Sequence, residues 1–178
     1  MMTGMTWIAP EVTDRQEPGP AGPERAQLEG WLDYHRKTLL TKCAGLTGEQ
    51  LATASVPPSN LTLMGLVRHM AEVERSWFRT RFCGQETGTI WITDEQPDAE
   101  FENAGPATAE EDYATFVREV GLARAAVAER DLDDTYYNKS FDAPMDLRWI
   151  FVHMIEEYAR HNGHADLIRE RIDGATGD

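Results

Sequence analysis

The residues best suited to chemistry in this sequence lie in one segment near its carboxyl end. His153, Glu157, His161 and His164 follow one another at spacings of four, four and three. In a helix, these spacings place the side chains on one face. If that face is buried, a carboxylate and several imidazoles are costly unless something pairs with them. A bound metal ion would satisfy them, because imidazole nitrogens and carboxylate oxygens are common metal ligands.

A further histidine, His69, occupies a comparable position in an earlier helical segment. Leu66 and Met70 flank it at helical spacing, so it should lie on an apolar face. A single histidine in that position is usually a core residue that hydrogen-bonds to a neighbour, and a Glu-x-x-x-His pair occurs by chance in many helices. Together, His69, Glu157 and His161 form a candidate metal set that leaves positions open for water or substrate.

Two more histidines share the face of the last helix. His164 could orient a ligand or act as a general base, and it is the candidate catalytic residue. His153 could do the same one turn earlier, and either could replace one of the three ligands. The alternative is that both only hydrogen-bond within the fold. Beside His69, the carboxylates of Glu72 and Glu74 are expected on a solvated face.

Four long helices should position these residues. Hydrophobic repeats predict helices that begin at Glu24, 61, 108 and 147 and end before Gly45 and near residues 82, 130 and 172. Residues 85–106 and 131–146 should be loops, and the first is long enough to cover the site as a lid. In the last helix the apolar stripe should include Ile150, Met154, Leu167 and Ile168, and its Trp149 should lie in the core. We predict an all-α fold, with an irregular arm over residues 1–23 and a four-helix bundle over residues 24–178.

Composition narrows the function classes. The chain has 178 residues, enough for one domain with a core, and its net charge is −14. This charge argues against nucleic acid and against a basic membrane contact as partners. There is no apolar run as long as a membrane span and no signal peptide, so we expect a cytoplasmic protein. Cys43 and Cys83 are expected to be reduced thiols, since two scattered cysteines do not make a disulfide framework.

Two segments resemble one known family. Residues 153–170 are similar to the last helix of the DinB superfamily, where a ligand-x-x-x-His pair precedes a glycine and a Leu-x-Arg run. Glu157, His161, Gly163 and residues 167–169 occupy those positions here. Residues 65–77 resemble that superfamily's second helix, which holds the first ligand, and His69 falls on its position.

The closest resemblance is to the branch grouped with the mycothiol S-transferases. It implies a DinB-like, up-up-down-down four-helix bundle, a divalent metal and often a homodimer. Many superfamily members have a third histidine where this chain has Glu157, and the His-Glu-His set is that of the mycothiol-dependent maleylpyruvate isomerase branch. Zinc is the expected metal, with nickel and iron as alternatives.

The resemblance implies chemistry with mycothiol or a similar low-molecular-weight thiol as cosubstrate. A metal ion can bind the sulfur as thiolate, which is its nucleophilic form. The leading hypothesis is therefore a metal-dependent, mycothiol-type S-transferase that acts on a small electrophile. One alternative is a hydrolase or isomerase in the same site, in which the metal lowers the pKa of a bound water to about 7. The other is a non-catalytic, metal-stabilised bundle that binds a small molecule.

Overall fold

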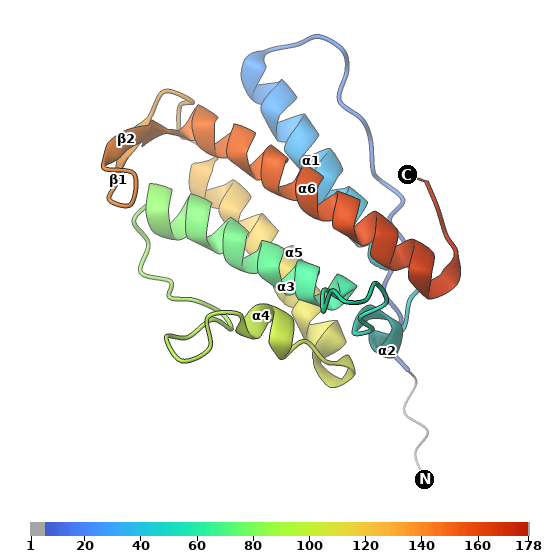
Figure 1. The fold of residues 1–178 in the computed structure, drawn as a ribbon. Coiled ribbons are helices and arrows are strands. Elements are labelled where there is room, and N and C mark those ends of the chain that lie inside the picture. The colour runs from blue at the N-terminus through green and yellow to red at the C-terminus, as the bar shows by residue number, and fades with distance from the viewer. Residues whose placement is uncertain (1–5, 178) are drawn as a thin grey trace.

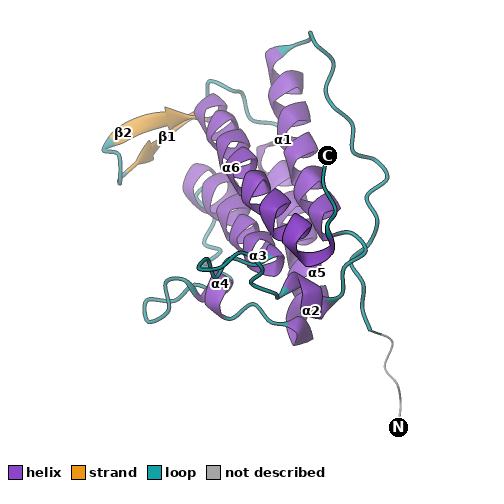
Figure 2. Ribbon diagram, turned by 45° about the vertical axis from the view of Figure 1, so that its right-hand side comes forward, coloured by secondary structure: helices purple, strands orange, loops and turns teal. Residues whose placement is uncertain are grey.

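The computed structural model of the chain describes residues 6–177 and is mostly helical. The long elements are α1 (Glu24–Cys43), α3 (Leu63–Glu74), its π-helical continuation η1 (Arg75–Phe82), α5 (Ala109–Val127) and α6 (Leu147–Asp173), all drawn in Figure 1. Shorter elements are α2 (Gly48–Leu51), α4 (Ala99–Glu102), the 3-10 turn η2 (Pro106–Thr108), β1 (Thr135–Asn138) and β2 (Ala143–Asp146). The prediction of a helical fold is confirmed, and a small sheet is added to it (Figure 2).

The long helices pack against one another through their apolar faces. Helix α1 packs mainly on α6, α3 mainly on α5, and α3 also contacts α6. Each contributes fully buried side chains to one core, among them Leu39, Leu66, Phe116 and Met154. This packing brings His69 on α3 and the histidine row on α6 to neighbouring helices, although about ninety residues separate them along the chain.

Side-chain caps define the starts of the two helices that carry the site. The Thr62 hydroxyl accepts a hydrogen bond from the Gly65 backbone N–H at 2.9 Å. The Asp146 carboxylate accepts one from the Trp149 N–H at 2.7 Å. Such caps satisfy N–H groups that the first turn leaves unpaired. Helix α6 ends at Asp173 and is capped by Gly174, whose φ of 78° is a left-handed conformation that glycine adopts without strain.

Two segments differ from the expected secondary structure. The helix expected up to residue 82 has that extent, but from Arg75 onward its hydrogen bonds take the π pattern. Residues 131–146, expected to be a loop, contain an antiparallel hairpin in which Tyr136 pairs with Met145. The hairpin lies beside the start of α6 (Figure 1). Its strands have four residues each, which is too short for a clear alternating pattern in the sequence.

The segment before α1 contains no helix within residues 6–23. It is attached to the turn after α1 by an isolated bridge between Ile8 and Thr47 and by buried Ala9. Within the described residues, none of the helices combines the length and apolar character needed to cross a membrane. Cys43 is buried and Cys83 half-buried, and neither forms a disulfide within that part of the chain.

A buried ionic network joins three of the long helices. Arg36 of α1 donates two hydrogen bonds of 2.7 Å to the two carboxylate oxygens of Glu74, and the Tyr158 hydroxyl donates a third at 2.8 Å. Burial alone would lower the pKa of Arg36, but the Glu74 carboxylate outweighs it and the pKa is raised. Burial, followed by the Glu74 charge, raises the pKa of Tyr158, which stays protonated as a donor. The prediction that Glu74 is solvated is wrong, because these partners replace its water.

Glu72 is also buried, contrary to the same prediction. One of its oxygens accepts hydrogen bonds from three consecutive backbone N–H groups, at 2.7 Å from Ile90, 2.7 Å from Trp91 and 3.2 Å from Ile92. Three donors stabilise a buried carboxylate well, because each replaces a lost bond to water. Glu72 thereby attaches the segment expected as a lid, residues 85–106, to helix α3.

Candidate metal centre

The ionisable row of α6 lies along one edge of the buried stripe. Ile150, Met154 and Ile168 are buried as expected, whereas Leu167 is exposed and does not belong to the stripe. The side chains of the row are partly exposed, between the core and solvent. The four residues are therefore accessible to ions and small molecules while still being partly desolvated.

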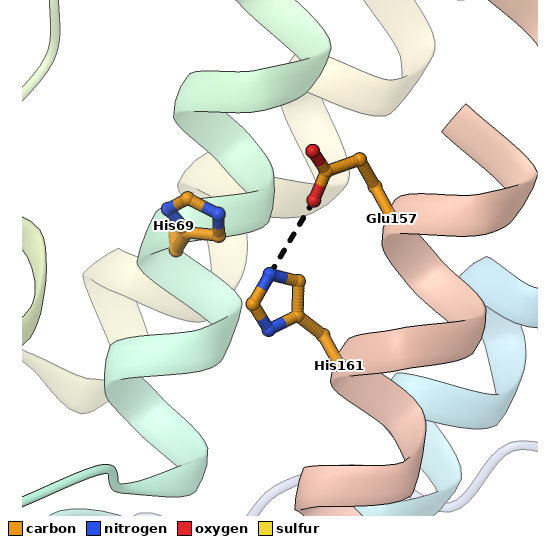
Figure 3. A group of neighbouring side chains, drawn as sticks. All are labelled: His69, Glu157 and His161. Atoms are coloured by element: carbon orange, nitrogen blue, oxygen red, sulfur yellow. Dashed lines mark ion pairs between the residues drawn. The ribbon is translucent and has the colours of Figure 1, made fainter. Parts of the chain in front are cut away.

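His69, Glu157 and His161 come together between α3 and α6 (Figure 3). Each offers one ligand atom, and these three atoms lie within 4.8 Å of one another. Glu157 Oε2 lies 3.5 Å from His161 Nε2, and the rings of His69 and His161 have centroids 4.8 Å apart. The side chains are 22%, 24% and 13% exposed, respectively.

These residues fit a divalent metal. A distance of 3.5 Å between Glu157 and His161 is long for a hydrogen bond. Two ligand atoms that each bind tetrahedral zinc at about 2.0–2.1 Å lie about 3.3 Å apart, so the observed separation is close to what one shared ion requires. Two imidazoles and one carboxylate are also the donor set of catalytic zinc sites with an open fourth position.

Two residues from the segment after η1 hold His69 in place. Glu100 Oε1 lies 3.3 Å from His69 Nδ1, and the Phe101 ring stacks on the imidazole with centroids 4.9 Å apart. A carboxylate at Nδ1 fixes the proton there and leaves Nε2 as the nitrogen available to a metal. Sequence reasoning missed both residues, because Glu100 lies thirty-one positions further along, in the short helix α4, and no periodic signal relates that helix to His69.

His164 lies beside His161 as Glu100 lies beside His69, next to the Nδ1 atom of the ring. Their Nδ1 atoms are 3.4 Å apart, so one ring can donate to the other, and His161 Nε2 faces Glu157. Burial, and then the proximity of His69 and His164, lowers the pKa of His161 to about 4. The imidazole is thus neutral at neutral pH, which is the form that binds metal.

The remaining histidines lie apart from this set or at its edge. His153 Nε2 is 3.5 Å from the second oxygen of Glu157, and His153, Glu156 and Glu157 form a second group with ligand atoms within 4.8 Å. Trp149 stacks on His153 and is 38% exposed, so the prediction that it lies in the core is wrong. His35 of α1 belongs to neither group and lies near Asn162.

Comparison with protein families shows which family the chain belongs to. The family model described as mycothiol-S-transferase matches residues 27–174, from α1 to the end of α6. The chain belongs to the mycothiol S-transferase family. This is a DinB-like family, so the resemblance seen in the sequence is confirmed. Comparisons with curated proteins and with solved structures found no match.

In this family member, Glu100→Gln should weaken metal binding by roughly 10- to 100-fold. Glutamine has the same shape as Glu100 but no charge, so it holds the Nδ1 proton of His69 less strongly and lowers the ligand's basicity. Titration with cobalt, followed by visible absorption, measures the effect. Glu102→Gln, an exposed change in the same short helix, is the matched control. Equal cobalt affinity in the wild-type and Glu100→Gln proteins would show that Glu100 has only a packing role.

Proposed function

We propose that the chain is a metal-dependent S-transferase that uses mycothiol, or a similar thiol, to modify a small electrophile. Two findings support the proposal. The chain belongs to the mycothiol S-transferase family, and His69, Glu157 and His161 form an accessible cluster of metal-ligand type. The observation that carries the argument is the convergence of these three side chains from two helices, because two imidazoles and a carboxylate directed at one point are a donor set for a divalent metal.

The proposal extends to the remaining features of the family. His69, Glu157 and His161 would hold one divalent ion, with zinc as the expected metal. The long helices would form the DinB-like, up-up-down-down four-helix bundle over residues 24–178, with residues 1–23 as an arm. Assembly as a homodimer and a cytoplasmic location belong to the same proposal.

The chain's own side chains would prepare the site for this reaction. A bound divalent ion would supply a positive charge that lowers the pKa of a thiol and holds it as thiolate. Glu100 and His164 would keep the Nε2 atoms of His69 and His161 directed at the ion by hydrogen bonding to Nδ1. In the transfer, sulfur forms a bond to an electrophilic carbon, and the leaving group departs with its bonding electrons.

A cavity next to the ligand set offers room for a substrate group. It has a volume of about 190 Å³, and His164, which lies beside the ligand His161, is one of its lining residues. Its other lining residues are mostly apolar: Val56, Ser59, Leu61, Leu167 and Ile168. Apolar walls with few polar groups are typical of small-molecule sites. Leu167 is exposed and does not pack in the core, so its side chain is free to contact a ligand in this cavity.

Cobalt-substituted protein tests the proposed activity. Adding mycothiol should produce an intense near-ultraviolet band from a thiolate–cobalt bond, and S-methylated mycothiol, which has no ionisable sulfur, should not. With zinc bound, the protein should accelerate the reaction of mycothiol with chlorodinitrobenzene, and the rate should rise with pH until the bound thiol is fully ionised.

The same experiment separates the alternatives. If mycothiol, bacillithiol, glutathione and cysteine all leave the cobalt spectrum unchanged, the S-transferase proposal fails. Hydrolysis of activated esters by the zinc protein would then favour the water-activating enzyme. A cobalt spectrum that does not change with added thiol or with pH would indicate that protein side chains occupy every coordination position of the metal. That outcome would favour a structural metal.

A further inference from the structure

An aromatic surface extends from the candidate metal centre toward the hairpin. His153, which lies 3.5 Å from Glu157, stacks on Trp149 with centroids 4.9 Å apart and planes inclined by 20°. Trp77 meets His153 edge-on at 4.6 Å, and Phe141 meets Trp149 edge-on at 6.0 Å. Trp149 is 38% exposed and Phe141 60% exposed. Grouped aromatic rings that remain accessible often mark a binding surface.

The side of this surface formed by Trp77 carries a positive charge. The Arg81 guanidinium lies over the Trp77 ring, 4.5 Å from its centroid. Arg81 also lines an open pocket of about 480 Å³ between the end of η1 and the hairpin. The residues that line the pocket include a second cation but no carboxylate; they are Thr80, Arg81, Tyr136, Tyr137, Asn138, Lys139 and Ser140. The nearest carboxylate in contact with them is that of Asp142, which accepts a hydrogen bond from the Tyr137 hydroxyl.

These two cations differ from most others in the molecule. Within residues 6–177, neither Arg81 nor Lys139 has a carboxylate partner, whereas most lysines and arginines of the chain form ion pairs. The chain carries a net charge of −14, so carboxylates are abundant. Two cations without ion-pair partners, among lining residues that include no carboxylate, therefore indicate a local site for an anion.

We infer that this pocket, which we name the hairpin pocket, binds an anionic group of the electrophilic substrate. The aromatic or conjugated part of that substrate would lie along Trp149 and Phe141, and its reacting end at Glu157. The last placement rests on the proposed function. Helix geometry puts Trp149 about 12 Å from Glu157, so the substrate must be an elongated molecule. A carboxylate at one end and the electrophilic carbon at the other define its class.

Binding of a model anion to metal-free protein tests the inference. Naphthoate and its neutral analogue naphthamide are the probes, and calorimetry measures both affinities. Metal-free protein is used because a carboxylate could otherwise bind the ion itself. Naphthoate should bind at least about tenfold more tightly than naphthamide, since a charge-assisted contact replaces a neutral one. Added sodium chloride should reduce this preference, because salt screens exposed charges.

Two substitutions separate the charge from the aromatic surface. Arg81→Met should lower the affinity for naphthoate about tenfold and leave that for naphthamide nearly unchanged. Trp149→Ala should weaken both. Arg118→Met is the matched control, because Arg118 is an exposed arginine of α5 with no carboxylate partner among the described residues. Lys139→Met provides a second variant in the hairpin pocket if Arg81→Met does not fold by circular dichroism.

Equal affinities of the wild-type protein for the two probes would overturn the inference. Unchanged naphthoate binding by both Arg81→Met and Lys139→Met would do the same. Cobalt titration of the same preparations keeps the proposed function separate, because Arg81 is not a proposed ligand and its variant should bind cobalt like the wild type. If the cobalt spectrum responds to mycothiol but the protein does not prefer naphthoate, only the proposal of an anion site in the hairpin pocket fails. If the protein prefers naphthoate but does not bind cobalt, the proposed function fails and the anion site stands by itself.

Discussion

Replacing His161 with alanine is expected to lower zinc affinity by more than 100-fold, and His69→Ala should have a similar effect. Losing a direct ligand should exceed the 10- to 100-fold loss typical of residues that only support one. Competition with a chromophoric chelator measures the affinity, and elemental analysis gives the metal content of dialysed protein. About one ion per chain is expected for the wild type and none for either variant.

His35→Ala is the matched control, since it removes a half-buried imidazole that lies outside both ligand groups. It should retain the ion. Retention by His69→Ala and His161→Ala together would show that the proposed ligands are wrong. If His153→Ala alone lost the ion, the metal would belong to His153, Glu156 and Glu157, the second group on α6.

The largest effect on stability is expected at Glu74. Glu74→Ala should reduce the free energy of unfolding by about 3–5 kcal/mol, because it removes the carboxylate that accepts two hydrogen bonds from the buried Arg36 guanidinium and leaves only the partly exposed Asp33 as its anionic partner. The Tyr158 hydroxyl would lose its acceptor as well. Urea unfolding followed by circular dichroism measures the change, and Glu129→Ala, an exposed substitution, should stay within about 0.5 kcal/mol.

A double variant tests whether the unpaired buried charge of Arg36 causes the loss of stability. Arg36→Met combined with Glu74→Leu removes both charges and fills the space with apolar atoms, so it should recover the part of the loss that comes from the unpaired arginine, while the Tyr158 hydroxyl still lacks its acceptor. A loss below about 1 kcal/mol for Glu74→Ala would mean that water or a neighbouring group already compensates the arginine, contrary to its burial in the structure.

Features that depend on spacing within one segment could be predicted from the sequence. Helix α6 was expected over residues 147–172 and runs from Leu147 to Asp173, because its repeat and its Asp146 cap are local. His153, Glu157, His161 and His164 lie on one face for the same reason, since helix geometry alone determines it. The family resemblance also rests on short local motifs, and the family model confirms it.

Features that depend on contacts between distant segments could not be predicted. Glu72 and Glu74 are charged residues of the kind usually found on a solvated helix face. Glu72 is buried because loop N–H groups bind its carboxylate, and Glu74 is buried because Arg36 does. Glu100 reaches His69 only because the chain after η1 returns to α3. A sequence pattern shows which way a side chain points from its helix, but not which donors another segment brings to it.

By itself, then, the sequence determined the helices, the shared face of the α6 histidines and the family. Only the tertiary structure decided that His69 meets Glu157 and His161, that Glu100 and Phe101 hold His69, and that Trp149 is exposed beside the hairpin. The physical reason is the distance along the chain over which each interaction acts. Backbone periodicity and capping act within a few residues, whereas burial, ion pairing and convergence of ligands depend on which helices pack together.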